Sequence, residues 1–383
     1  MDAPRPLTID DTPAHGGGLR VLMTTDAIGG AWACTLELCR SLGPLGVEVV
    51  LATMGRQPSL AQRVQVAALE NVTLFTSSYQ LEWMIDPWRD VAAAGRWLSA
   101  LADDMRVDMV HLGGYVHAAL PWRVPVVVTA YSCVFGWWNA VRGHDPPPHW
   151  RRYRERVCAG IHSADSVVAP TLAAVEEVQR HYGSLRDARA IYCGKIRGPF
   201  APSPKNAVIL ASGAMWDQAK NVAALDDVAP RLPWPVWLSG PVTRSDGRRY
   251  EPLHMRSLGP MAPLGFAEEL GRAAIYALPA RYEPYGFSLL EAAESGCALV
   301  LGDIPSLREL WDDAALFVPP DDRDALHGAL TALIENDGLR RHLARKAWLR
   351  AQSYEPARMG AAYTALYREL IQRKSETRVA ASW

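Results

Sequence analysis

Short apolar runs alternate with helical patterns along the whole chain, and this alternation restricts the fold more than any other feature. The runs of the first half that read as strands are Leu19 to Thr24, Val47 to Thr53, Val107 to Leu112, Pro125 to Thr129 and Ser166 to Ala169. Helical patterns follow the first and the last of them, at 32–42 and 172–182. Because strands that alternate with helices pair in parallel, the first half is predicted to form a doubly wound α/β sheet.

The second half repeats this organisation after a break in composition. Between Gly194 and Lys205 the chain holds three prolines, two glycines and three basic residues, which is typical of a hinge. The strands predicted beyond it are Ala207 to Ala211, Val236 to Leu238, Ile275 to Leu278, Ala298 to Leu301 and Ala315 to Val318. A last amphipathic helix is expected from Ala357 to Gln372. We therefore predict a flexible leader at 1–18, Rossmann-like domains at 19–195 and 206–352, and a C-terminal helical segment at 353–374.

Composition excludes several classes of protein. With 40 basic and 41 acidic residues, the chain lacks the positive charge that phosphate neutralisation by a nucleic-acid protein requires. No stretch approaches 18 consecutive apolar residues and the first residues form no apolar signal segment, so we expect a cytoplasmic protein. The cysteines show no Cys-x2-Cys spacing, so we expect reduced thiols and no zinc site. They are Cys34, Cys39, Cys133, Cys158, Cys193 and Cys297.

The segment from Ala280 to Ala293 is the strongest candidate for a ligand site. It follows the apolar run Ala273 to Leu278 and places Glu283 in a loop and Glu291 about one turn into a helix. Ligands of open α/β sheets bind at the carboxyl ends of strands, where helix N-termini offer free amide groups to phosphates. The alternative is a capping box, Ser288-x-x-Glu291, whose side chains only satisfy the first turn of the helix. Spacing alone leaves both interpretations open.

The sequence around these glutamates resembles the nucleotide-binding motif of family GT4, the retaining glycosyltransferases with a GT-B fold. The resemblance rests on Glu-Pro-Tyr-Gly at 283–286, on Leu-Glu-Ala at 290–292 and on Ser-Gly-Cys-Ala-Leu-Val at 295–300. It implies two Rossmann-like domains that face a cleft, with the C-terminal helix crossing back to the N-terminal domain. It also implies a hexose-type sugar, a UDP-, GDP- or ADP-linked donor, neither metal nor cofactor, and a glycan, lipid-linked or small-molecule acceptor.

By the same resemblance, Glu283 hydrogen-bonds the transferred sugar and Glu291 binds the ribose of the nucleotide. The backbone of Gly286, Phe287 and Ser288 is expected to hold the sugar and the phosphate. Such enzymes react at the front face of the sugar, and the leaving phosphate helps to deprotonate the acceptor, so no side-chain nucleophile is required.

Two glycine-containing loops extend the resemblance. Val21 to Gly30 looks like the first strand and double-glycine loop of the family, in which Gly29 and Gly30 would let the backbone approach the diphosphate; a tight turn is the alternative. Gly213 to Asn221 looks like the loop that enters the second domain, and it supplies Lys220 for the diphosphate.

The chain departs from the family pattern at three places. Ala214 stands where an arginine usually binds the diphosphate, and Arg281 and Lys195 are candidate substitutes. Tyr131 stands where a histidine usually lies near the reacting sugar, although a phenol that titrates near pH 10 is no near-neutral proton carrier. The third change is Cys193 in a turn that commonly holds asparagine.

These departures keep two other functions open. One is a catalytically degenerate GT-B protein that binds a sugar or a partner enzyme without transfer, and the other is an enzyme that uses a sugar phosphate. Retention of Glu283, Glu291 and Lys220 favours the glycosyltransferase.

Several weaker signals have an ordinary structural alternative. Asp322-Arg323-Asp324 matches a metal-binding Asp-x-Asp by letters, but we expect a helix cap there. His111 and His117 would either line the cleft or serve the core, and Trp137-Trp138 would be a sugar platform or core packing. The basic run Arg151 to Arg156 suits peripheral contact with anionic lipid, at the inner membrane surface, as well as a solvated helix face.

Overall fold

A computed structural model describes residues 18–196, 198–244 and 247–381. The chain divides into two compact units. Unit 1 takes the described residues up to Val134, together with Pro146–Gly194 and the segment from Glu355 onward, and unit 2 consists of Phe135–Asp145 and Lys195–Tyr354. Apart from Gly18, the predicted leader lies outside the described residues.

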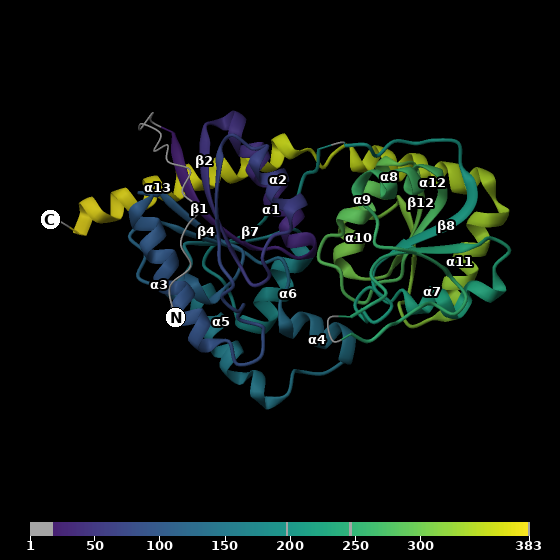
Figure 1. Ribbon diagram of the computed structural model, residues 1–383, viewed down its shortest axis with the longest axis horizontal. Helices are drawn as coiled ribbons and strands as arrows, with labels where there is room; N and C mark the ends of the chain where they lie inside the picture. The colour runs from purple at the N-terminus through teal and green to yellow at the C-terminus, as the bar shows by residue number, and fades with distance from the viewer. Residues whose placement is uncertain (1–17, 197, 245–246, 382–383) are drawn as a thin grey trace. The chain divides into compact units, whose positions relative to one another are not determined.

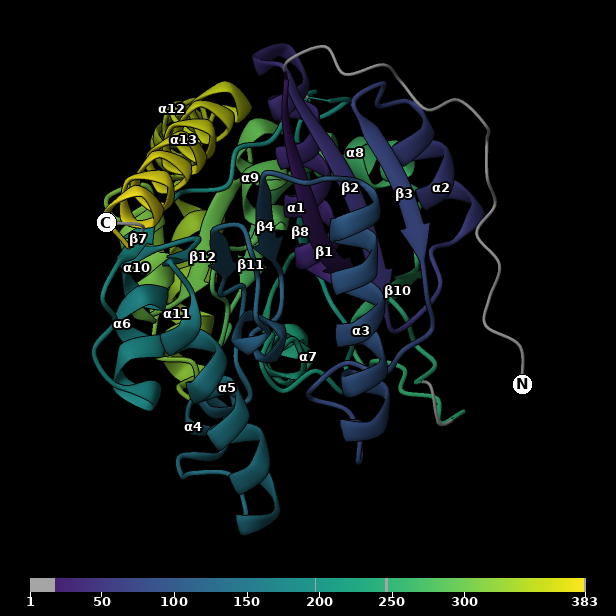
Figure 2. The same ribbon diagram turned by 90° about the vertical axis from the view of Figure 1, so that its left-hand side faces the viewer.

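The described part of unit 1 contains a seven-stranded sheet in the order β3-β2-β1-β4-β5-β6-β7, and every pairing is parallel. Figure 2 shows β1, β2 and β3 running side by side. The strands are β1 (Leu19–Asp26), β2 (Val47–Met54), β3 (Val72–Thr76), β4 (Met109–Leu112), β5 (Val126–Thr129), β6 (Ser166–Ala169) and β7 (Ala188–Ala190). The five strands predicted for this half are confirmed, and β3 and β7 are additional.

Helices cover this sheet and connect its strands. They are α1 (Gly29–Leu42), α2 (Leu60–Ala67), α3 (Trp88–Asp104), α5 (Arg151–Ser163), α6 (Leu172–Tyr182) and α13 (Pro356–Ala381), with short 3₁₀ turns η1 (Gly43–Leu45), η2 (Val116–Ala119) and η3 (Pro148–Trp150). Helix α4 (Val134–Arg142) begins at the last residue before the first segment of unit 2.

The last helix of the chain belongs to unit 1, as the GT-B resemblance predicted. Helix α13 packs on α1, and Figure 1 shows it in yellow beside the purple strands of this unit. Its Tyr363 and Tyr367 are buried. His111 of β4 lies between α13 and β5, because its Nδ1 is 2.6 Å from the hydroxyl of Tyr367 and its Nε2 is 2.5 Å from the hydroxyl of Thr129. This contact makes the end of the chain part of the first core.

The described part of unit 2 contains a six-stranded parallel sheet in the order β10-β9-β8-β11-β12-β13. The strands are β8 (Asn206–Ser212), β9 (Val236–Ser239), β10 (Arg256–Gly259), β11 (Ala273–Leu278), β12 (Ala298–Gly302) and β13 (Ala315–Val318). The helices are α7 (Ala223–Val228), α8 (Pro263–Arg272), α9 (Phe287–Glu294), α10 (Pro305–Trp311), α11 (Arg323–Glu335) and α12 (Asp337–Ala351), with η4 (Ala229–Arg231) after α7. The five strands predicted here are confirmed, and β10 is additional.

The strand order of unit 2 fixes where a ligand can bind. All residues of the inner strands β11 and β12 are buried, so their apolar runs serve the core. The order reverses between β8 and β11, and in open α/β sheets the crevice at this reversal, outside the carboxyl ends of the strands, receives the ligand. The loops after β8 and β11 carry Lys220 and Glu283.

No described helix is long and apolar enough to span a lipid bilayer.

Candidate functional site

The loops that follow β8 and β11 are joined by backbone hydrogen bonds. The carbonyl oxygen of Ala219 accepts from the amide of Arg281 at 2.8 Å and from the amide of Tyr282 at 3.2 Å. Lys220 and Glu283 flank this joint, so the backbone brings the two predicted site residues together. The sequence separates them by 63 positions.

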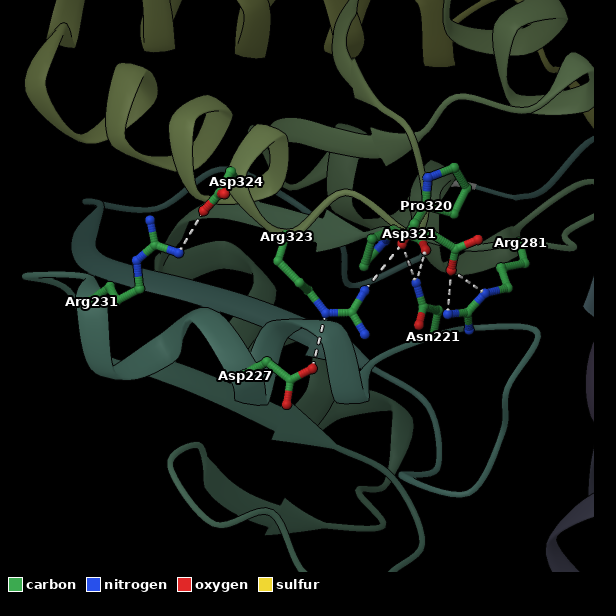
Figure 3. A network of polar contacts seen from close by, with 9 residues as sticks. Asn221, Asp227, Arg231, Arg281, Pro320, Asp321, Arg323 and Asp324 are labelled. Carbon is green, nitrogen blue, oxygen red and sulfur yellow. Dashed lines mark hydrogen bonds and ion pairs between the residues drawn. The ribbon is translucent and has the colours of Figure 1, made fainter.

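Asn221 supports the contact between the loops after β8 and β11 with its side chain. The sequence predicted no role for it. It adopts a left-handed conformation, with φ of 55°, which asparagine tolerates better than most residues. Its buried side-chain amide donates to the carbonyl oxygens of Pro279, at 2.9 Å, and Pro320, at 2.7 Å (Figure 3). One side chain thereby ties together the segments that follow β8, β11 and β13.

Glu283 is buried at this joint, with 7% of the residue exposed. Its carboxylate forms an ion pair with the ammonium group of Lys220, and its Oε1 accepts weakly from the amide of Tyr285, at 3.4 Å. The hydroxyl of Ser306, in the first turn of α10, donates to the carbonyl oxygen of Glu283 at 2.6 Å. Burial lowers the pKa of Lys220, and Asp217 opposes this effect. The Lys220 side chain is 30% exposed and that of Glu283 is 8% exposed, so the ammonium group is the more accessible member of the pair.

Helix α9 begins directly after this loop with an uncapped first turn. Gly286, at φ of 87°, precedes the helix, and a Cβ added there would meet the side chain of Leu289 at 2.8 Å. In the described structure no side chain caps this helix, so the capping-box interpretation of Ser288 and Glu291 is wrong. Ser288 instead hydrogen-bonds the hydroxyl of Tyr276. The amides at the start of α9 are therefore left for solvent or for an anionic ligand.

Glu291 has a cationic partner of its own. Its carboxylate pairs with the ammonium group of Lys195, and the two side chains are 17% and 15% exposed. The same ammonium lies 4.3 Å from the centre of the Phe200 ring. Burial raises the pKa of Glu291, and the positive charge of Lys195 opposes that rise. Each motif glutamate is thus matched by one lysine within unit 2.

Arg281, the other candidate substitute for the missing arginine, is turned to a different partner. Its Nε and Nη2 donate to Oδ1 of Asp321 at 2.8 and 2.6 Å (Figure 3). Its Nη1 donates to the carbonyl oxygen of Gln218 at 3.1 Å. This guanidinium fixes the loop after β8 against the segment after β13. Lys195 is therefore the candidate that lies on a motif glutamate.

The Asp-x-Asp letters at 322–324 form a helix cap, as expected. Oδ1 of Asp322 accepts from the amide of Ala325 at 2.8 Å and so caps α11, whereas Asp324 pairs with Arg231. Arg323 reaches Asp227 (Figure 3). The two aspartates have separate partners, and among the described residues no group of three or more His, Cys, Asp or Glu side chains is placed to hold a metal ion.

The predicted glycines of unit 1, Gly29 and Gly30, lie where the strand order of its sheet reverses. Gly29, at φ of 62°, and Gly30 open α1 after β1, beside the reversal of strand order between β1 and β4. Within the described structure, a Cβ added at either glycine would meet no atom within 4 Å. Asp26 lies before them, and its Oδ1 accepts from the amide of Ile28 at 3.1 Å. Burial raises the pKa of Asp26, and this hydrogen bond opposes the rise.

Tyr131 follows β5 and packs toward α1. Its hydroxyl is 3.4 Å from the hydroxyl of Thr35, which is 3.2 Å from the hydroxyl of Thr25. Burial raises the pKa of Tyr131 to about 12, and the contact with Thr35 opposes the rise. A phenol in this environment stays protonated at neutral pH, so it can donate a hydrogen bond but cannot accept a proton as a base.

His111 and His117, the two histidines that the sequence offered for the cleft, serve the core of unit 1. His111 is 2% exposed between Tyr367 and Thr129, and burial lowers its pKa to about 3. His117 is also buried, and its Nε2 is 2.9 Å from the carbonyl oxygen of Val91. Trp137 and Trp138 are half-buried with ring centres 5.9 Å apart, and this geometry leaves both interpretations of the pair open.

The expectation of reduced thiols is wrong for two of the six cysteines. Cys34 of α1 forms a disulfide with Cys193, and their Cα atoms are 6.2 Å apart. Cys193 lies at the end of the unit 1 segment Pro146–Gly194. The two cysteines are 159 positions apart in sequence, so only the folded chain brings them together and no spacing motif signals the pair. Cys39, Cys133, Cys158 and Cys297 take no part in a disulfide within the described structure.

Comparisons with known proteins agree with this architecture. The sequence model described as Glycosyltransferase Family 4 matches residues 28–194, and the model described as Glycosyl transferases group 1 matches residues 263–350. A D-inositol 3-phosphate glycosyltransferase from Corynebacterium glutamicum is 24% identical over 90% of this chain and 92% of its own length. A phosphatidyl-myo-inositol mannosyltransferase from Mycolicibacterium smegmatis is 32% identical, but the match spans only 27% of each chain.

Solved structures show the same fold. A sucrose-phosphate synthase from Thermosynechococcus elongatus superposes with a TM-score of 0.77 at 18% identity, over 93% of this chain and 100% of that one. The HepE protein of Anabaena, in complex with UDP and glucose, gives a TM-score of 0.71 at 16% identity, over 92% and 100% of the two chains. With both halves matched by glycosyltransferase families and the fold shared, the chain belongs to the GT4 family of glycosyltransferases with a GT-B fold.

Proposed function

We propose that this glycosyltransferase is a retaining, metal-independent hexosyltransferase that uses a nucleotide-sugar donor. Glu283 accepts hydrogen bonds from the hydroxyls of the transferred sugar, and the first amides of α9 bind the phosphate. Lys220 balances the charge of the diphosphate, and Glu291 accepts from the ribose hydroxyls. Tyr131 donates a hydrogen bond near the reacting sugar, and Gly29 and Gly30 give the diphosphate access to backbone.

The observation that carries the proposal is the cluster at the reversal point of the unit 2 sheet. An elongated ligand with a polyhydroxyl ring, a diphosphate and a ribose needs a carboxylate at each end and amide donors between them. Glu283 and Glu291 supply the carboxylates, and the uncapped start of α9 lies between them in the chain. An ionised carboxylate can accept from two adjacent hydroxyls, and both a hexose and a ribose offer such pairs.

The names of the similar proteins suggest the reactants. HepE was solved with UDP and glucose, which supports a UDP-linked hexose as the first donor to test. The curated relatives are named for a mannosyl transfer to phosphatidyl-myo-inositol and for a glycosyl transfer to D-inositol 3-phosphate. We therefore propose an acceptor of the polyol, glycan or lipid-linked class, with an inositol-type acceptor as the first candidate.

A lipid-linked acceptor would require contact with a membrane surface from the cytoplasmic side. Helix α5 carries exposed Arg151, Arg152, Arg154 and Arg156. The guanidinium groups of Arg152 and Arg156 lie 4.9 and 5.1 Å from the ring of Trp88. In the loop before α3, the helix that begins at Trp88, Ile85 is 94% exposed and Trp83 is 45% exposed. Basic residues beside exposed apolar ones suit the surface of anionic lipid.

The test is a thermal-shift screen against UDP, GDP, ADP and their common sugar conjugates. A ligand at a hundred times its dissociation constant adds about 2.7 kcal/mol to the free energy of unfolding. We expect one nucleotide family to raise the unfolding temperature, and we expect Glu291→Ala to abolish the effect. Glu268→Ala, which removes an exposed carboxylate from α8, should leave the shift unchanged. The anomeric configuration of the product, read by NMR, then tests retention.

Two outcomes of this screen would favour other functions. If well-folded protein responds to no nucleotide but does respond to a sugar phosphate, Glu291→Ala should have no effect, because no ribose would be present. If nucleotide binding occurs without transfer to any acceptor, the departures at Ala214 and Tyr131 would indicate a degenerate binding protein. Restoring Ala214→Arg and Tyr131→His would then be expected to recover transfer.

A further inference from the structure

We propose that Lys195 is the residue that makes this site selective for a phosphorylated nucleoside, because it supplies positive charge beside the ribose-binding carboxylate. The inference rests on the proposed nucleotide-sugar function and adds a residue that the motif itself does not contain. Lys195 is the first residue of the second segment of unit 2, immediately after Gly194, the last residue of the preceding segment of unit 1.

The position of Lys195 is fixed by contacts at both ends of the residue. Its backbone amide donates to the carbonyl oxygen of Tyr354, the last residue of unit 2, at 3.3 Å. Its ammonium group pairs with Glu291 and lies 4.3 Å from the centre of the Phe200 ring. Phe200 is buried, so this aromatic face stays in place under the cation. These contacts hold the charge at one point of the site.

The pair retains limited access to solvent, as a ligand site requires. Lys195 and Glu291 are 15% and 17% exposed, so each keeps an open side while the rest is enclosed. A lysine carries three donors on a compact ammonium group, and Glu291 uses only part of that capacity. The remaining donors can bind a phosphate oxygen without breaking the ion pair.

Charge balance explains why a cation is needed here. A carboxylate that binds ribose stands a few bonds from the 5′-phosphate of the same nucleoside, and two anions at that distance repel each other. Burial already raises the pKa of Glu291, so a phosphate alone would favour the protonated acid, which is a poorer acceptor for two hydroxyls. Lys195 offsets both effects, because it attracts the phosphate and stabilises the ionised carboxylate.

The neighbouring cations have other partners. Lys220 pairs with Glu283, and the guanidinium of Arg281 is bound by Asp321 and by the carbonyl oxygen of Gln218. The loop after β8 carries the uncharged Ala214. Of these three cations, Lys195 is therefore the one that lies beside Glu291, the proposed ribose-binding carboxylate.

The test compares nucleosides with their diphosphates by isothermal titration calorimetry at pH 8. The probes are uridine and UDP, guanosine and GDP, and adenosine and ADP, on wild type, Lys195→Met, Lys195→Gln and Lys195→Arg. We expect Lys195→Met to weaken binding of the diphosphate about ten- to a hundredfold, the range of one charge-assisted hydrogen bond, and to weaken nucleoside binding by less than about threefold. Lys195→Arg should keep most of the diphosphate affinity.

Further variants separate this role from a purely structural one. Lys346→Met, which removes a half-buried lysine of α12 that pairs with Asp313, should change neither affinity. If Lys195→Met does not fold, Lys195→Gln tests the charge, because its amide can still donate to Glu291. Equal losses of nucleoside and diphosphate affinity would overturn the proposal in favour of a structural contact, and so would an unchanged diphosphate affinity. Wild-type protein that binds no nucleotide would instead contradict the proposed function.

Discussion

The ammonium group of Lys220 contacts the carboxylate of Glu283, and the two residues come from the loops that follow the two central strands of one sheet. Both residues lie where the strand order reverses. A buried ion pair costs desolvation energy that its own attraction seldom exceeds, so such a pair is poor evidence of stabilisation. Its place at a reversal point supports the proposal that the two charges bind a ligand, because ligands of open α/β sheets bind there.

Glu283→Gln should abolish most of the transfer activity while the protein remains folded. The amide keeps the size of the side chain but loses the charge that accepts the sugar hydroxyls, and the loss of one such contact in a preorganised site lowers kcat about a hundredfold or more. Steady-state kinetics with the donor found in the screen measure this effect, with Glu268→Gln as the control. Near-wild-type kcat in Glu283→Gln would contradict the assigned role.

Asp322→Ala should lower the free energy of unfolding, and transfer activity should remain independent of metal in this variant. The carboxylate caps α11, and loss of such a cap costs about 1 kcal/mol. Asp324→Ala breaks only a surface pair whose side chains are 50% and 86% exposed, so it should cost less than about 0.5 kcal/mol. Denaturant unfolding distinguishes the two variants. Transfer should continue in EDTA, whereas a metal site would make EDTA and both substitutions inhibitory.

The disulfide predicts a specific count of thiols. Of the six cysteines in the chain, four should react with a thiol reagent in denatured, unreduced protein, and six after reduction. A cross-link over a long loop stabilises a protein by about 2 to 4 kcal/mol, so Cys34→Ser should lower the unfolding temperature and Cys158→Ser should change it little. Six reactive thiols before reduction would show that the bond does not form.

Acid should weaken unit 1 through His111. Its pKa is about 3 in the folded protein and near 6.5 in the unfolded chain, so between these values only the unfolded chain binds the proton. Stability is therefore complete above pH 6.5 and is lost as the pH falls toward 3, by about 2 kcal/mol at pH 5. Tyr363 and Tyr367, which face His111, stay protonated because burial raises the pKa of each.

Thermal unfolding between pH 7 and pH 5 measures this effect. His111→Gln should lower stability at pH 7 but flatten the dependence on pH. His342→Gln removes an exposed histidine of α12 and should leave the wild-type slope. An identical slope in His111→Gln and wild type would assign the acid sensitivity to other groups.

The inner strands of both sheets and the edge strand β13 were predictable from the sequence, and the other three edge strands were not. Strands such as β11 are buried on both faces, which requires a continuous apolar run that the sequence shows directly. The three strands without such a signal, β3, β7 and β10, all lie at sheet edges, and their residues are exposed or half-buried. An edge strand packs on fewer neighbours, so its sequence carries a weaker pattern.

The candidate site divides in the same way. The motif predicted the positions of Glu283, Glu291 and the start of α9, because a strand, a loop and a helix lie within a short segment. The partners of these residues come from distant segments: Lys195 is 96 positions from Glu291, and Lys220 is 63 positions from Glu283. Asn221 acts through an unusual backbone conformation and two proline carbonyls, which no residue spacing encodes.

The assignment of α13 to unit 1 has a consequence for how the chain is made. A ribosome releases residues in order, so Lys195–Tyr354 is complete and able to close its own core before the helix that begins at Pro356 has emerged. The N-terminal sheet, although synthesised first, lacks the cover of His111 until Tyr363 and Tyr367 of α13 are present. Unit 1 is therefore expected to complete its folding after unit 2, and a truncated chain that ends at Tyr354 would contain all of unit 2 and a unit 1 without its last helix.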